Sequence, residues 1–181
     1  MTDAAPPAEP ALNDARRGRT ETGMALALAC FLLLLDQATK ILVEQSFRLH
    51  ESRELIEPFF SLTYVRNYGA AWSLFNGHGW FLLLIAAAVT AASLHYFRYL
   101  TEGYAERCFA IWIILSGVVG NSIDRIWRGA VVDFFDLHWG AWHWPVFNVA
   151  DIAICTGVGL FLLSTLLRPA RRSGTAGEAA R

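Results

Sequence analysis

Four long apolar runs, separated by polar connections, dominate the hydrophobic pattern of this chain. Few charged residues interrupt the runs, and each is close to the ~20 residues that a helix needs to cross a bilayer. The pattern therefore predicts an all-α polytopic membrane protein. We expect its four transmembrane helices at about residues 24–43, 80–99, 106–123 and 146–167.

The segments outside these runs are polar and rich in small residues. We expect residues 1–23 and 169–181 to be disordered tails that flank one membrane domain over residues 24–168. Arginines precede the first run, as in a signal sequence, but no small-residue cleavage site follows it. The first run is therefore expected to stay in the protein as an uncleaved span.

Two of the connections contain β-like sequence. Residues 59–75 begin with FFSLTYVRNY, in which aromatic and β-branched residues partly alternate with polar ones, and this is typical of a short strand or hairpin. The run VVDFF, at 131–135, has the same character, whereas four glutamates in 44–58 indicate a solvated loop. We expect a small β-cradle and a short amphipathic connection on the outer face, and Pro145 at the start of the last helix.

Composition supports the membrane assignment. Hydrophobic residues make up 55% of the chain and charged residues 17%, against about a quarter charged in soluble domains. The net charge of −1 gives no general attraction to nucleic acid. The three cysteines form no CxxC or Cys/His cluster, and His138 and His143 lie among aromatic residues typical of a membrane interface, so we expect neither a metal nor a cofactor.

The distribution of arginines predicts the orientation of the spans. Arginines are more frequent in the two tails and the 98–107 connection than in the two other connections. Positively charged flanks stay in the cytoplasm, so both termini should be cytoplasmic, which agrees with an even number of spans. No coiled-coil pattern is evident, and we expect a monomer.

Charged residues inside or beside the spans need an explanation, because such residues are costly there. Asp36 and Lys40 have the i, i+4 spacing of a helical ion pair. They either neutralise each other, with Lys40 free to reach the interface, or brace a site. At the end of the third span, Asn121 and Arg125 share a helix face, and Asp124 is expected to be neutralised by Arg125.

Asp133 and Asp151 lack an adjacent cation. Asp133 lies among Val and Phe, where desolvation should raise its pKa, although Asp136 competes for any role assigned to it. Asn148 and Asp151 share one face of the last span, with Asp151 roughly 9 Å inside Pro145 at ~1.5 Å per residue. If the two aspartates converge, they can share a proton and activate water as in an aspartic peptidase.

Other chemistries have less support in the sequence. There is no HExxH stretch for a zinc peptidase and no GxGD stretch for other intramembrane aspartic peptidases. The main rival is a small four-span transporter that relays protons through intramembrane Asp and Arg residues. A non-catalytic assembly subunit would explain the spans but not the acids.

Four blocks of sequence resemble the bacterial lipoprotein signal peptidases (signal peptidase II) and occur in the order of that family. They are DQATK at 36–40, NYGAAWSL at 67–74, GNSIDRIWRGAVVDFFDLH at 120–138 and FNVADIAI at 147–154. The match covers nearly the whole chain between the tails. Two departures lie beside motif residues, Trp72 in place of a smaller aromatic and Ile152 in place of Ser, and they concern substrate positioning.

The resemblance implies a four-helix bundle with a β-cradle in the bacterial inner membrane, with the active site toward the periplasm. It implies that Asp133 and Asp151 are the catalytic pair and that no cofactor is used. The substrate would be a diacylglyceryl-modified prolipoprotein, cut just before the lipidated cysteine, and globomycin would be an inhibitor. The matching positions that would line or brace the site are Asp36, Lys40, Asn67, Gly69, Asn121, Asp124, Arg125 and Asn148.

Overall fold

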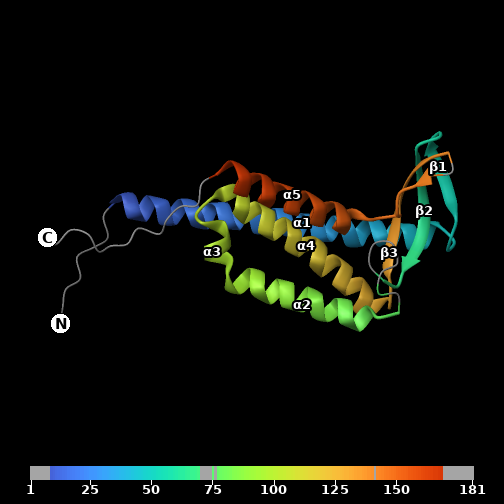
Figure 1. The fold of residues 1–181 in the computed structure, drawn as a ribbon, viewed down its shortest axis with the longest axis horizontal. Helices are drawn as coiled ribbons and strands as arrows, with labels where there is room; N and C mark the ends of the chain where they lie inside the picture. Colours follow the sequence, from blue (N-terminus) through green and yellow to red (C-terminus); the bar gives the residue numbers. More distant parts are fainter. Residues whose placement is uncertain (1–8, 70–74, 76, 141, 169–181) are drawn as a thin grey trace.

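A bundle of long helices carries a small sheet across one of its ends (Figure 1). The computed structural model describes residues 9–69, 75, 77–140 and 142–168, with side chains from Arg16 onward. The helices are α1 (Glu9–Ser46), α2 (Gly79–His95), α3 (Phe97–Thr101), α4 (Ala105–Trp127) and α5 (Val149–Leu167), and the strands are β1 (Ser52–Ile56), β2 (Phe60–Asn67), β3 (Val131–Trp139) and β4 (Trp142–His143).

Three of the described helices, α1, α4 and α5, are long and apolar enough to cross a membrane. This agrees with the first, third and fourth predicted spans. The second predicted span, 80–99, is divided, because α2 ends at His95 after 17 residues and the short α3 follows. Figure 1 shows α2 alongside α4, running from the sheet end to the opposite end of the bundle.

Helix α1 begins earlier than we expected. It starts at Glu9, so the part of the N-terminal tail from residue 9 onward is helical and not disordered. An i, i+4 ion pair between Arg17 and Glu21, at 2.9 Å, supports the helix in this polar stretch. The rest of that tail, and the C-terminal tail of 169–181, lie outside the described residues.

Helix α4 is the centre of the bundle and packs against α1, α2 and α5. Two of its glycines permit this close approach. A Cβ atom on Gly117 would lie 2.3 Å from the carbonyl oxygen of Ala150, and one on Gly120 would lie 2.6 Å from Oδ2 of Asp36. Glycine at such contacts is a common means of packing helices in membranes, and here it sets the spacing between the elements that carry the predicted site.

The sheet is antiparallel, with the strand order β1-β2-β3-β4. The predicted β-like segment at 59–75 is confirmed for β2, while residues 70–74 lie outside the described residues. The prediction of a loop over 44–58 is wrong in part, because β1 pairs with β2 although all its residues are exposed. Strand β3 is the buried strand, and its pairing with β2 sets Val65 opposite Asp133 and Asn67 opposite Val131.

The last helix begins later than Pro145, where we had expected it to start. The backbone of Phe147 is still extended, because it pairs with Phe135 of β3. Asn148 then caps the helix, and α5 begins at Val149. Asp151 therefore lies in the first turn of α5, close to the sheet, and not deeper in the span.

Candidate active site

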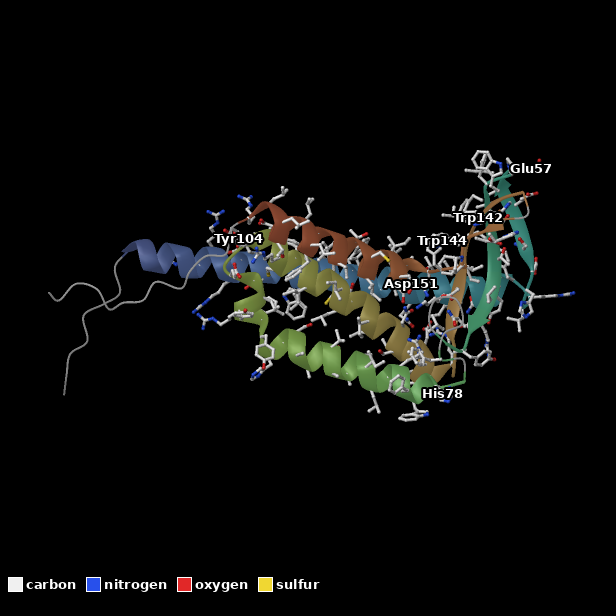
Figure 2. The ribbon with its side chains drawn as sticks, viewed as in Figure 1. Glu57, His78, Tyr104, Trp142, Trp144 and Asp151 are labelled. Atoms are coloured by element: carbon white, nitrogen blue, oxygen red, sulfur yellow. The ribbon has the colours of Figure 1, made fainter. Side chains whose placement is uncertain are left out.

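Asp151 of α5 lies where the bundle joins the sheet (Figure 2), and Asp133 of β3 is hydrogen-bonded to Asn148, the residue that caps the same helix. One residue, Asn148, bonds to both carboxylates. Its side-chain Nδ2 donates a hydrogen bond to Oδ1 of Asp133 at 2.6 Å, and its backbone N–H donates to Oδ2 of Asp151 at 3.3 Å. Two aspartates 18 positions apart in the sequence are thus held together around one asparagine.

The orientation of Asp151 is fixed from two helices. Asn148 and Asp151 form a capping box, in which Oδ1 of Asn148 accepts a bond from the N–H of Asp151 at 3.0 Å. Such a box satisfies two of the free N–H groups at a helix start. From α4, Nδ2 of Asn121 donates to Oδ1 of Asp151 at 2.8 Å.

Asp133 is buried, with 2% of its surface exposed. Nδ2 of Asn67, at the end of β2, donates to its Oδ2 at 3.0 Å. Burial raises the pKa of Asp133 to about 7, and repulsion from Asp151 adds to the rise, while the bonds from Asn67 and Asn148 oppose it. Near neutral pH, Asp133 therefore exists in both its protonated and its ionised form.

An ion cluster centred on the buried residues Lys40, Asp36 and Asp124 lies next to the pair and contacts it through Asn121. Nζ of Lys40 is 2.9 Å from Oδ2 of Asp36 and 2.9 Å from Oδ2 of Asp124, and it donates to Oδ1 of Asn121 at 3.0 Å. The predicted Asp36–Lys40 pair is confirmed, and Lys40 does not extend toward the interface, because none of its surface is exposed. A buried ammonium needs partners for all its N–H groups, and Lys40 has three.

The predicted pairing of Asp124 with Arg125 is wrong. Oδ1 of Asp124 is instead 2.7 Å from Nη1 of Arg128. The reason is helical geometry, since residues four apart share a face and adjacent residues do not. Arg125 donates to the carbonyl oxygens of Gly69, at 2.9 Å, and Asn121, at 3.3 Å, and its buried Nε has no hydrogen-bond partner among the described residues.

Arg128 and Gln37 also belong to this cluster, and neither was predicted as a site residue. Arg128 has the same i, i+4 spacing to Asp124 that identified Asp36 and Lys40, so the signal was present. Gln37 donates through Nε2 to Asp36, at 3.0 Å, and to Asp124, at 3.2 Å. No spacing rule singles it out, because its partners come from two helices.

The ion cluster also holds the start of α5. Oδ1 of Asp36 accepts a bond from the backbone N–H of Ala150 at 2.9 Å. Ala150 is the second residue of α5, and an anion is stabilised at this positive end of a helix dipole. Since Asp151 is the next residue, Asp36 of α1 fixes the position of the turn that carries it.

Asn67 is oriented by the turn that follows β2. Its Oδ1 accepts a hydrogen bond from the N–H of Gly69 at 2.9 Å, so this turn orients the amide that reaches Asp133.

Asp136, which the sequence left as a competitor of Asp133, has other partners. It accepts a hydrogen bond from the hydroxyl of Thr63 at 2.8 Å. It lies an odd number of positions from Asp133, and alternate strand residues face opposite sides. Ile152 is 45% exposed on α5, and Trp72 lies outside the described residues.

This chain is similar to known proteins of one family. A family model described as "Signal peptidase (SPase) II" matches residues 28–167. A lipoprotein signal peptidase of Syntrophotalea carbinolica is 41% identical over 143 residues, covering 77% of this chain and 88% of the relative. One of Haemophilus influenzae is 43% identical over 145 residues, covering 76% and 82%.

Two solved structures have the same fold as this chain. A bacterial membrane enzyme solved at 2.3 Å resolution has a TM-score of 0.74 and 30% identity, covering 84% of this chain and 95% of that one. A second, solved at 1.9 Å, has a TM-score of 0.73 and 31% identity, covering 81% and 95%.

Proposed function

Because this chain belongs to the signal peptidase II family, whose members are membrane peptidases, we propose that Asp133 and Asp151 are the catalytic pair of an aspartic endopeptidase. The observation that carries the proposal is the position of Asn148, which donates a hydrogen bond to each carboxylate. Family membership also favours a peptidase over the proton-coupled transporter that the sequence left open.

The chemistry follows from two carboxylates that share one proton. The ionised aspartate takes a proton from a water molecule while the water oxygen attacks the carbonyl carbon of the scissile peptide bond. The protonated aspartate gives its proton to the carbonyl oxygen, and a tetrahedral intermediate forms. The carbon–nitrogen bond then breaks as the nitrogen is protonated, and the pair returns to its starting state. No cofactor takes part in these steps.

The depth of the pair suits a lipid-anchored substrate. Asp151 lies in the first turn of α5, at the level where the apolar helices end and the sheet begins. A diacylglyceryl-modified prolipoprotein, held by its acyl chains in the outer leaflet, would present the bond before its lipidated cysteine at this level. In this arrangement the four longer helices, α1, α2, α4 and α5, cross the inner membrane of a bacterium, the sheet faces the periplasm, and both termini are cytoplasmic.

The test is cleavage of a synthetic lipidated prolipoprotein by the purified protein. Asp133→Asn and Asp151→Asn should each lower kcat/KM at least about a hundredfold, because each removes one partner in proton transfer. Asp136→Asn changes a carboxylate in the same strand and should retain activity. Full activity in either catalytic variant, with the protein correctly inserted, would show that the pair is assigned wrongly.

The substrate class is tested with the same preparation. Cleavage should require the diacylglyceryl group and should be blocked by globomycin, as the family resemblance implies. A transporter would release no product in this assay. Cutting of the unlipidated precursor at the same rate would contradict the proposed substrate.

A further inference from the structure

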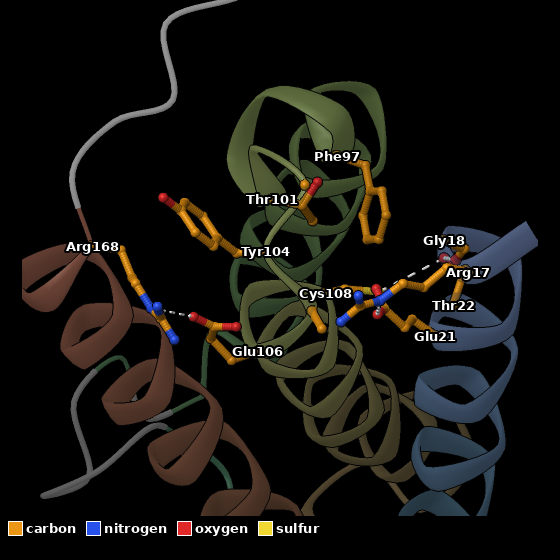
Figure 3. Close-up of a pocket in the computed structure, with 12 residues that line it drawn as sticks. Arg17, Gly18, Glu21, Thr22, Phe97, Thr101, Tyr104, Glu106, Cys108 and Arg168 are labelled. Carbon is orange, nitrogen blue, oxygen red and sulfur yellow. Dashed lines mark hydrogen bonds and ion pairs between the residues drawn. The ribbon is translucent and has the colours of Figure 1, made fainter. Parts of the chain in front are cut away.

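A cavity of about 650 Å³ lies at one end of the bundle, and Figure 3 shows residues that line it. One of them, Tyr104, lies at the opposite end of the bundle from Asp151 (Figure 2). The cavity lies between α1, the connection from α3 to α4, and the end of α5. Its volume is in the range of small-molecule sites. The described residues that line it are Arg17, Gly18, Glu21, Thr22, Phe97, Thr101, Gly103, Tyr104, Ala105, Glu106, Cys108 and Arg168.

Two ion pairs face each other across this cavity. On one wall, Arg17 lies 2.9 Å from Glu21 within α1. On the other wall, Arg168, at the end of α5, lies 3.2 Å from Glu106 of α4. Figure 3 shows the ring of Tyr104 near the second pair. The cavity lining thus offers two cations and two carboxylates, with no net charge.

We propose that this cavity binds the headgroup of a zwitterionic phospholipid that carries a primary ammonium group. The phosphate suits a guanidinium, which can bind it through two N–H groups. The ammonium suits the carboxylate of Glu106, which lies beside the guanidinium of Arg168 on the same wall. A purely anionic headgroup would leave the two glutamates repelling it, and a quaternary ammonium has no N–H to donate to them.

The surroundings of Arg168 favour a lipid over a free phosphate. Leu166 and Leu167 directly precede it and are 83% and 70% exposed, and Leu163, one turn earlier, is 54% exposed. Acyl chains can therefore pack on α5 immediately below the guanidinium that holds the phosphate. In the orientation proposed above, this lipid belongs to the cytoplasmic leaflet. The inference depends on the helices crossing the membrane, but not on which residues are catalytic.

The second wall is held in place before a ligand binds. Arg107 is 3% exposed and lies 2.9 Å from Glu102, and its Nε donates to the hydroxyl of Ser164 at 3.2 Å. The same hydroxyl donates to Glu106 at 3.3 Å. Because these bonds join α4 to α5, they fix the carboxylate of Glu106 and reduce the entropy that binding would cost.

The experiment is native mass spectrometry of the full chain, titrated in detergent with phosphatidylethanolamine, phosphatidylglycerol, phosphatidylcholine and inorganic phosphate. We expect the ethanolamine lipid to bind most tightly. Glu106→Gln should weaken it about tenfold and remove its advantage over phosphatidylglycerol, while Arg168→Gln should weaken all three lipids about tenfold. Arg98→Gln is the control, because Arg98 is an exposed cation of α3 that is not among the described lining residues.

Several outcomes would overturn the proposal. They are equal binding of the three lipids, a preference for phosphatidylglycerol, unchanged binding in both variants, or displacement of the lipid by millimolar inorganic phosphate. Prolipoprotein cleavage is measured on the same samples, and both variants should retain it, which shows that they are folded. A wild-type protein that binds the lipid but cleaves nothing would contradict the proposed function alone.

Discussion

At the scale of single residues, the side-chain hydrogen bonds that the described part of the chain gives to the carboxylate pair come from amides. Asn67, Asn148 and Asn121 donate the hydrogen bonds, while Lys40 is kept behind Asn121, to which it donates at 3.0 Å. A cation in direct contact would favour ionisation of the aspartates. Neutral donors orient both carboxylates and still allow Asp133 to hold a proton, which the proposed mechanism needs.

The raised pKa of Asp133 predicts a pH limit on activity. Cleavage should fall as the pH rises above about 7, because the shared proton is then lost. In Asn67→Ala this alkaline limb should move to higher pH, by about one pH unit, since a bond that stabilises the ionised carboxylate is gone. The measurement is kcat/KM between pH 5.5 and 9 for both proteins. A limb that moves to lower pH would contradict the assignment.

The raised pKa of Asp133 also predicts how the stability of the folded protein depends on pH. Because the pKa of Asp133 is higher in the folded protein than in the unfolded chain, folding favours its protonated form. Its contribution to the free energy of unfolding is therefore present at acid pH and is lost as the pH rises through about 7. The unfolding temperature in detergent should fall between pH 5.5 and 8.5, and less so in Asp133→Asn. An equal fall in both proteins would assign the effect to other groups.

At the scale of elements, the central helix α4 positions the site through its glycines. Apolar periodicity predicted that this helix exists, but its partners depend on atoms that a hydrophobic pattern does not describe. The absence of a side chain at Gly117 lets the carbonyl of Ala150 approach. That contact sets the position of the first turn of α5, and therefore the positions of Asn148 and Asp151.

Gly117→Ala should separate α4 from α5. The added Cβ would meet a backbone oxygen at 2.3 Å, and a backbone cannot give way as a flexible side chain can. We expect a loss of about 1–3 kcal/mol in the free energy of unfolding and reduced cleavage, measured by thermal unfolding and by the prolipoprotein assay. Gly159→Ala, in α5, has no atom within 4 Å of the added Cβ and should change neither.

At the scale of the whole molecule, the sheet and the cavity lined by Glu106 and Arg168 lie at opposite ends of the bundle. Figure 1 shows the sheet at one end and the connection from α3 to α4 at the other. A membrane crossed by α1, α2, α4 and α5 would place these ends on opposite sides. The orientation rests on the distribution of arginines, and the crossing of α2 on its course alongside α4.

Labelling with a membrane-impermeant maleimide tests this arrangement. In a chain with its native cysteines replaced, Glu57→Cys, at the turn between β1 and β2, should react in intact cells. Arg98→Cys, beyond the end of α2, should react only after permeabilisation. Reaction of both in intact cells would show that α2 does not cross the membrane.

The sequence by itself determined the long apolar helices, the β-like segments and the Asp36–Lys40 pair, because these depend on periodicity and on spacing within one element. It did not determine the start of α5, since the extended backbone at Phe147 is held by Phe135 of another segment. The pairing of Asp124 with Arg128 also depends on i, i+4 spacing within one helix, and the prediction of Arg125 passed over it.

Only the tertiary structure decided which distant residues meet. β2 pairs with β3, α4 packs on α5, and Asn148 consequently lies between Asp133 and Asp151. The family resemblance implied the two aspartates, and their juxtaposition now has a physical basis. Contacts between elements depend on packing and on buried hydrogen bonds, and these have no periodic signature in a single sequence.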